Sequence, residues 1–264
     1  MTDPTWTYTF LCASAFLAGV MNAVAGGGTL LTFPALATAL IPLVGAEGAP
    51  AFANATSTVA LLPGSFAGSL GYRKELNESR RFVLRMLLPS LLGGFLGAWL
   101  VGRDTGTFKA LVPWLILTAA VLFVVQAPLA RWLKVYKSEH EPGPGLQALL
   151  IGFQFLVAVY GGYFGAGIGI LMLTTLGFMG VGDIHRMNAV KTLLAVLING
   201  ASVVVFVRDG LVIWEYALAM AGAAILGGYA GARVALRLPA HYVRYAVIVI
   251  GFGLSAYYFI REYG

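Results

Sequence analysis

The chain has 264 residues, of which 59% are hydrophobic and only 11% are charged, and its formal net charge is +6. Its mean hydropathy of +0.84 excludes a water-soluble globular domain and indicates an integral membrane protein. Cys12 is the one cysteine of the sequence, so the chain can form no intramolecular disulfide and no cysteine-rich metal site. We expect no cofactor, no bound metal and no nucleic-acid partner.

Apolar runs fill most of the chain and predict an all-α membrane protein. Most of them reach the roughly 20 residues that a helix needs to cross the hydrocarbon core of a bilayer. They do not alternate between apolar and polar residues, as the strands of a membrane β-barrel do. No basic residue precedes the first run, as one would in a cleavable signal peptide, so we expect this run to remain attached. The runs cover residues 6–44, 49–72, 82–101, 110–132, 146–181, 187–207, 211–236 and 242–260.

Glycines interrupt the first and the fifth of these runs, each of which is too long for a single crossing. The sequence AGGGTLLTFPAL occupies residues 25–36, and GAGIGILMLTTL occupies residues 165–176. Clustered glycines destabilise a helix and expose backbone amides and carbonyls, which a bilayer tolerates only inside protein or beside a polar cavity. We therefore predict a break at each cluster, after which helices restart over 29–40 and 169–177.

The two halves of the chain repeat one another. Sliding the sequence along itself pairs Asn54 with Asn188, and it pairs LGGFLGA with LGGYAGA further on. A polar stretch over 131–147, which contains prolines and glycines, is predicted to be a cytoplasmic linker. The first membrane repeat then covers 1–130 and the second 148–264, each with about five helical segments.

The distribution of Lys and Arg predicts how the copies are oriented. If both long runs turn back at their glycines, only Arg103, Lys109, Arg208 and Arg261 lie on one side of the membrane. If each run is a single crossing, the basic residues divide almost evenly, so the positive-inside rule favours the first arrangement. An odd number of segments per copy then makes the copies inverted repeats, with both termini outside the cytoplasm. The charge count leaves open whether the returning segments are full crossings or half-helices.

The restarting helices carry the predicted chemistry. The first amides of a helix lack intrahelical partners and bear about half a positive charge, so they attract anions, and glycine lets a ligand approach the backbone. Two such N-termini related by inversion can converge on one anionic group near mid-membrane. Regularly spaced glycines serve close helix packing instead, and the pairs assigned to that role are Gly64 and Gly68, Gly93 and Gly97, and Gly227 and Gly231.

Polar side chains within the apolar runs are the other candidates, because polarity in lipid is costly unless it faces a cavity or a partner. Asn54 and Asn188 are equivalent, and each either contacts the ligand or holds the broken backbone. Lys191 either supplies a positive charge beside the site or extends its stem to water at the cytoplasmic surface. The candidate substrate-binding residues are Asn22, Gly26, Gly27, Gly28, Thr29, Asn54, Thr58, Gly165, Gly167, Gly169, Asn188, Lys191 and Thr192.

Few titratable residues lie where they could meet both a cavity and water. Glu47, Asp183, His185 and Glu215 all stand near segment ends, and the sequence identifies none of them as a proton carrier. The coupling ion, a proton or another ion, therefore stays open. The basic cluster within 73–85 is interpreted as a topology signal that also contacts anionic membrane lipid.

The first glycine cluster with Pro34 after it, the segment YGGYFGAG that opens the second, and the duplicated unit resemble the TauE/SafE family of sulfite and sulfonate exporters, also called the toluene sulfonate uptake permease family. The resemblance covers nearly the whole chain and is most specific in AGGGTLLTFPAL and GGYFGAGIGILMLTTL. It implies a multi-pass transporter of sulfur-containing or other organic anions in a bacterial inner membrane, coupled to an ion gradient. The chain departs from the pattern at Thr29, where a glycine is common, and at Thr174, which pairs with Pro34.

Three classes of function remain: an anion carrier, a passive anion channel and a membrane-embedded enzyme. The apolar runs hold no paired acid and base, no activated nucleophile and no metal-ligand set, so we expect no catalytic residue. Inverted repeats around broken helices favour a secondary transporter that works by alternating access, with a channel as the alternative. We predict a carrier of sulfite, a sulfonate, sulfoacetate or a similar anion. The particular anion, its direction, the coupling ion and the oligomeric state, a homodimer included, stay open.

Overall fold

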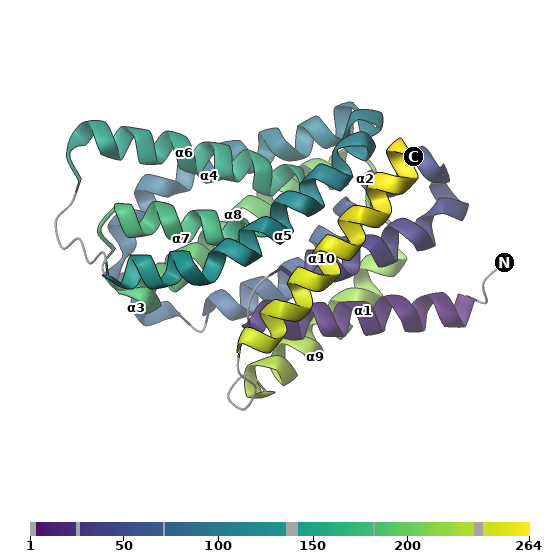
Figure 1. The fold of residues 1–264 in the computed structure, drawn as a ribbon, viewed down its shortest axis with the longest axis horizontal. Helices are drawn as coiled ribbons and strands as arrows, with labels where there is room; N and C mark the ends of the chain where they lie inside the picture. The colour runs from purple at the N-terminus through teal and green to yellow at the C-terminus, as the bar shows by residue number, and fades with distance from the viewer. Residues whose placement is uncertain (1–3, 25–26, 71, 136–141, 182, 235–239) are drawn as a thin grey trace.

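The computed structural model describes residues 4–24, 27–70, 72–135, 142–181, 183–234 and 240–264 (Figure 1). These residues form ten α-helices, which confirms the predicted all-α class. The helices are α1 (Pro4–Val24), α2 (Thr29–Leu70), α3 (Arg73–Glu78), α4 (Arg80–Arg103), α5 (Thr105–Val135), α6 (Pro144–Tyr163), α7 (Ile168–Phe178), α8 (Ile184–Arg208), α9 (Trp214–Val234) and α10 (Ala240–Tyr263).

Five of the described helices are long and apolar enough to cross a membrane, namely α2, α4, α5 as far as Gln126, α6 and α8. Large hydrophobic side chains such as Leu88 on α4 and Leu149 on α6 are exposed on the surface of the molecule. Water disfavours such surfaces, whereas lipid tails accommodate them. The chain is therefore a multi-pass membrane protein, as its composition predicts.

The two long runs return through helices of different length. α2 has 42 residues but bends at Gly45, where φ is 77°, a left-handed conformation that favours glycine. α7 has only 11 residues, so it spans about 16 Å, roughly half of a hydrocarbon core about 30 Å thick. The second long run therefore returns as a half-length helix and not as a full crossing.

Helices from one half of the chain pack against helices from the other half. α1 lies along α9, and α6 lies along α4. A Cβ at Gly93 would lie 2.6 Å from the carbonyl oxygen of Phe155, and one at Gly227 would overlap the carbonyl group of Phe16. The packing role predicted for these two glycines is confirmed. A Cβ at Gly68 would meet no atom within 4 Å, so the packing role predicted for this glycine is wrong.

The described ends of the predicted linker are helical. α5 continues to Val135 and α6 begins at Pro144, while residues 136–141 lie outside the described part of the chain. Proline suits the first turn of a helix, because the amide that it lacks would have no intrahelical partner there. The repeat boundaries at 131–147 stay a prediction.

Ion pairs join helices at both ends of the molecule. α1 begins and α10 ends at one end, and α3 lies at the opposite end (Figure 1). At the α3 end, Arg186 of α8 forms a salt bridge of 2.6 Å with Glu78. At the other end, Lys109 of α5 binds Glu47 of α2 at 2.8 Å and Glu262 of α10 at 3.5 Å.

Candidate functional site

The first glycine break joins α1 to α2. α1 ends at Val24 and α2 begins at Thr29, as predicted, and Gly26 lies outside the described residues. Gly27 has a φ of 89°, and a Cβ at this position would overlap the ring of Phe123 on α5. Both the backbone conformation and the close approach of α5 therefore require glycine here.

An asparagine of α1 caps the first break. The amide of Gly28 donates a hydrogen bond of 2.7 Å to Oδ1 of Asn22. One turn further on, the buried hydroxyl groups of Thr32 and Ser57 lie 2.6 Å apart and bind one another. One of the amides predicted to attract an anion is thus already bound by the protein.

The second glycine break joins α6 to α7 and lacks such a cap. α6 ends at Tyr163 and α7 begins at Ile168, one residue before the predicted restart. Gly165 and Gly167 have φ values of 81° and 80°, so the backbone is left-handed at both positions. No side chain of the described residues caps α7, so its N-terminus keeps the positive end of its dipole.

A hydrogen bond from Tyr160 of α6 holds the second break in place. Its hydroxyl group donates a hydrogen bond of 2.9 Å to the carbonyl oxygen of Ala166 and lies 3.4 Å from the carbonyl oxygen of Leu115 on α5. This residue was not predicted from the sequence. A tyrosine shortly before a glycine cluster, inside an apolar run, was the available signal, because a buried tyrosine hydroxyl needs a hydrogen-bond partner.

Lys191 of α8 lies beside the uncapped start of α7. A Cβ at Gly169 would lie 3.2 Å from Cδ of Lys191, so the lysine stem packs against this glycine. The Nζ group donates a hydrogen bond of 3.0 Å to Oδ1 of Asn188. Within the described residues, no carboxylate oxygen lies within 4.0 Å of this ammonium group. The stem therefore brings a positively charged side chain close to the positive end of the α7 dipole.

The two equivalent asparagines bind different partners. Asn54 is 1% exposed, and its Nδ2 group donates a hydrogen bond of 3.0 Å to the carbonyl oxygen of Tyr163, at the end of α6. Its Oδ1 atom has no hydrogen-bond partner among the described protein atoms. Thr58 and Thr192 each donate a hydrogen bond of 2.8 Å to the backbone of the asparagine four residues earlier, Asn54 or Asn188. Asn54 therefore supports the second break from the first half of the chain.

Aromatic rings connect the two breaks. Phe33, one turn into α2, packs edge to face against Phe164 of the second break, with ring centroids 5.3 Å apart, and both are buried. α5 contacts both breaks, through Phe123 at Gly27 and through Leu122 at Gly167. The structure thus brings the two predicted breaks together. The phenylalanines were not predicted, because nothing in the sequence distinguishes them from other apolar residues.

Membrane-crossing helices with two interrupted helices packed around a shared centre place the chain among polytopic membrane transporters. The chain belongs to the sulfite exporter TauE/SafE family, whose model matches residues 11–258. The resemblance noted in the sequence is thereby confirmed. It is a family of transporters, so the protein is a membrane transporter and not an enzyme.

Several bacterial relatives carry the description of probable membrane transporter proteins. One from Haemophilus influenzae is 27% identical over 248 residues, which cover 91% of this chain and 90% of the relative. The ORF9 protein of a Sinorhizobium species is 29% identical over 251 residues, 93% of this chain and 90% of the relative. The YfcA protein of Escherichia coli K12 is 25% identical over 247 residues, 92% and 86% of the two chains. No solved structure matches the chain.

Proposed function

We propose that this protein is a secondary transporter for a small organosulfur or related organic anion, such as sulfite, a sulfonate or sulfoacetate. The anion is held near mid-membrane at the glycine breaks, chiefly by the uncapped N-terminus of α7, and Lys191 supplies a full positive charge. The observation that carries this proposal is Lys191, whose stem packs against Gly169 in the first turn of α7 and whose ammonium group has no carboxylate partner among the described residues.

The electrostatics of the second break favour an anionic ligand. A charge within a membrane-spanning helix costs several kcal/mol unless it is paired. An anion at the start of α7 would pair the ammonium group and accept hydrogen bonds from the free amides of the first turn. The family that matches the chain is described as sulfite exporters, and sulfite and sulfonates carry several oxygen acceptors around one centre.

We further propose that the two halves are inverted repeats and that both termini lie outside the cytoplasm. The helix packing supports this symmetry, because each half packs against the other in the same way. α1 of the first half lies on α9 of the second, and α6 of the second half lies on α4 of the first. Gly227 meets Phe16 in one pair, as Gly93 meets Phe155 in the other. The distribution of basic residues between the two ends of the molecule supports the position of the termini outside the cytoplasm. Lys109 lies at the end where α1 begins, opposite the basic residues that surround α3.

Ion pairs at both ends of the molecule support a mechanism of alternating access. Lys109 joins α2, α5 and α10 by its two ion pairs, and α10 also carries Tyr258, whose ring contacts Phe33 with centroids 6.2 Å apart. Arg186 and Glu78 join α8 and α3 at the other end. We propose that these contacts open in turn, so that the anion site meets one side of the membrane at a time.

Binding and transport by the purified protein test this function. Sulfite, sulfoacetate, taurine, thiosulfate and simple carboxylates are titrated against the wild type, the Lys191→Met variant and the Lys191→Arg variant. Met keeps an unbranched stem without the charge, whereas Arg keeps the charge. Lys74→Met, at an exposed position on α3, is the matched control. We expect one class of anion to bind the wild type, the control and, more weakly, the Arg variant, whereas the Met variant loses binding. Equal affinity of wild type and Lys191→Met for every anion contradicts the site.

Flux measurements separate a carrier from the alternative, a passive channel. In proteoliposomes, a carrier saturates with substrate and exchanges labelled anion against unlabelled anion on the other side. Imposed proton and sodium gradients identify the coupling ion. Flux that rises linearly with anion concentration and shows no exchange contradicts alternating access.

A further inference from the structure

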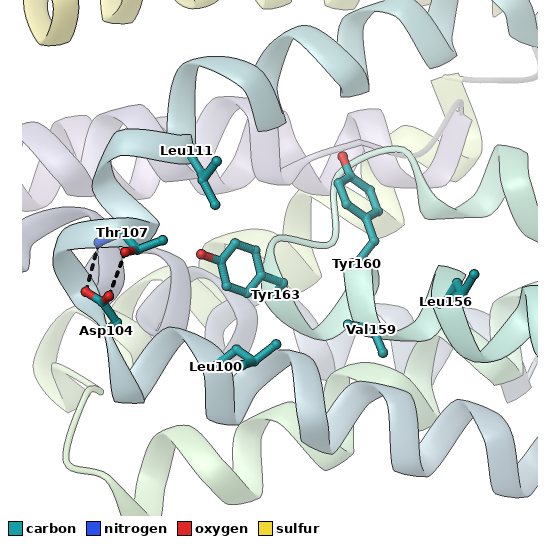
Figure 2. Close-up of a pocket in the computed structure, with 8 residues that line it drawn as sticks. All are labelled: Leu100, Asp104, Thr107, Leu111, Leu156, Val159, Tyr160 and Tyr163. Atoms are coloured by element: carbon teal, nitrogen blue, oxygen red, sulfur yellow. Dashed lines mark hydrogen bonds between the residues drawn. The ribbon is translucent and has the colours of Figure 1, made fainter.

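An apolar groove lies between α4, α5 and α6 and is lined by residues of these helices and of the turn after α4 (Figure 2). Its volume is about 510 Å³, which lies within the range of pockets that hold a small organic molecule, about 300–1,000 Å³. Leu100, Leu111 and Leu156 line it and are all exposed. Since these leucines belong to membrane-crossing helices, the groove opens toward the lipid.

The polar groups of the groove gather at one end. Asp104 stands between α4 and α5, and its two carboxylate oxygens accept hydrogen bonds of 2.9 Å and 2.6 Å from the amide and the hydroxyl group of Thr107. Figure 2 shows the hydroxyl group of Tyr163 directed toward this pair. The rest of the lining is apolar except for Tyr160, whose hydroxyl group is bound to the carbonyl oxygen of Ala166, so the groove matches an amphipathic molecule with its polar head beside Asp104.

The charge of Asp104 decides the sign of that head. The hydrogen bonds from Thr107 hold the pKa of this carboxyl group below its usual value, so the group is negative at neutral pH. An anionic solute is repelled here, which distinguishes the groove from the proposed anion site. A cationic head is attracted, and a carboxylate prefers a primary ammonium, which can donate hydrogen bonds, to a quaternary one, which cannot.

The position of Asp104 also fits a membrane lipid. It follows the last residue of α4, where a crossing helix reaches the headgroup region. Next to it, the guanidinium group of Arg103 lies 4.9 Å from the ring of Trp99, and tryptophan and arginine side chains are typical of the membrane interface. A phospholipid with its head at this level directs its acyl chains along the leucines.

We propose that this groove binds a glycerophospholipid with a primary amine headgroup, one acyl chain filling the space between α4, α5 and α6 and the ammonium group contacting Asp104. The acyl chain lies against Tyr160, which also lines the groove. The hydroxyl group of Tyr160 binds the carbonyl oxygen of Ala166 in the second break. The bound lipid therefore packs against the ring of Tyr160, whose hydroxyl group holds this break in place.

Lipid retention in nanodiscs tests the proposal without reference to transport. The full chain is reconstituted in equal amounts of palmitoyl-oleoyl phosphatidylethanolamine, phosphatidylcholine and phosphatidylglycerol, and the lipids that stay bound are identified by native mass spectrometry. For the wild type we expect phosphatidylethanolamine to exceed each of the others about fivefold, as one solvent-exposed ion pair allows.

Three variants assign the retained lipid to the groove. Leu111→Trp fills the groove and is expected to lower retention about fivefold, whereas Leu149→Trp, at an exposed position of α6 outside the groove, leaves it unchanged. Asp104→Asn keeps a residue suited to capping α5 but removes the charge, so it retains lipid without preference for the amine. Three results overturn the proposal: equal retention of the three lipids by the wild type, unchanged retention in Leu111→Trp, or a change of oligomeric state in Leu111→Trp, which assigns the groove to a second copy of the chain.

Discussion

The two glycine breaks have similar sequences but differ in the side chains that contact them. At the first, Asn22 binds the amide of Gly28 and the ring of Phe123 covers Gly27. At the second, no side chain caps α7, and the stem of Lys191 lies against Gly169. A break in a membrane helix must satisfy its exposed amides. The first break does so with the side chain of Asn22, and at the second we propose that a ligand binds the start of α7.

The glycines of the two breaks therefore have different structural roles. In the first break, the glycines serve the fold, because they permit the turn and the close approach of α5. In the second break, they additionally leave room for a charged side chain. The two turns are similar, and the side chains around them differ, notably Lys191 and Asn54 at the second break. The binding chemistry that we propose depends on this difference.

The largest effect is expected at Gly27. The Gly27→Ala substitution places a side chain at a φ of 89° and into the ring of Phe123, which we expect to destabilise the protein by about 3 kcal/mol. Thermal unfolding in detergent measures the loss. Gly253→Ala on α10, where a Cβ meets no atom within 4 Å, is the control. If Gly27→Ala unfolds at the wild-type temperature, the first break is not under this constraint.

Removal of the Lys191 charge at the second break is expected to weaken anion binding without lowering the stability of the protein. Lys191→Met should weaken the tightest-binding anion of the panel about tenfold or more, since bonds to charged groups contribute about 1.5–3 kcal/mol. Without anion, the variant should unfold at the same temperature as the wild type or above it, because an unpaired charge has left the membrane interior. The measurement is the unfolding temperature with and without anion. A lower unfolding temperature without anion identifies Lys191 as structural.

The sequence predicted the breaks because their signal is local. Glycine clusters within apolar runs fix where a helix stops, and the observed starts of α2 and α7 agree with the prediction to within one residue. Lys191 could be named for a similar reason, since a charge inside an apolar run is conspicuous by itself. Its stem packs against Gly169 of α7 and its ammonium group binds Asn188, while its part in anion binding stays a prediction.

The contacts between the breaks could not be predicted. Phe33, Phe164 and Phe123 acquire their roles only when α2, α5 and α6 approach one another, and an apolar residue in an apolar run gives no sign of that approach. Asn22 illustrates a second limit, because capping an amide and binding a ligand use the same side-chain chemistry. Only the distance of 2.7 Å to Gly28 shows which partner it has.

A smaller effect is expected at Asn22, and it falls on stability alone. Asn22→Ala removes the cap of α2 and should destabilise the protein by about 1 kcal/mol, while Asn22→Asp keeps an acceptor and should retain most of the stability. Anion affinity should stay at the wild-type value in both variants, since the first break already satisfies its own amide. A loss of affinity without a loss of stability in Asn22→Ala would show that this residue contacts the ligand. That result contradicts the proposal that only the second break binds the anion.

The smallest effect is expected where the copies differ by one side chain. Gly169 pairs with Thr29 of the first copy, so Gly169→Ala makes the second break more like the first. The added Cβ would lie 3.2 Å from Cδ of Lys191, and the flexible stem can move away by a few tenths of an ångström. Alanine favours a helix over glycine by about 0.5–1 kcal/mol, so stability should hold or rise. Displacing the ammonium group should weaken anion binding about threefold. Unchanged affinity means that the lysine need not lie against α7 when it binds the anion, and the space left by glycine then has no part in binding.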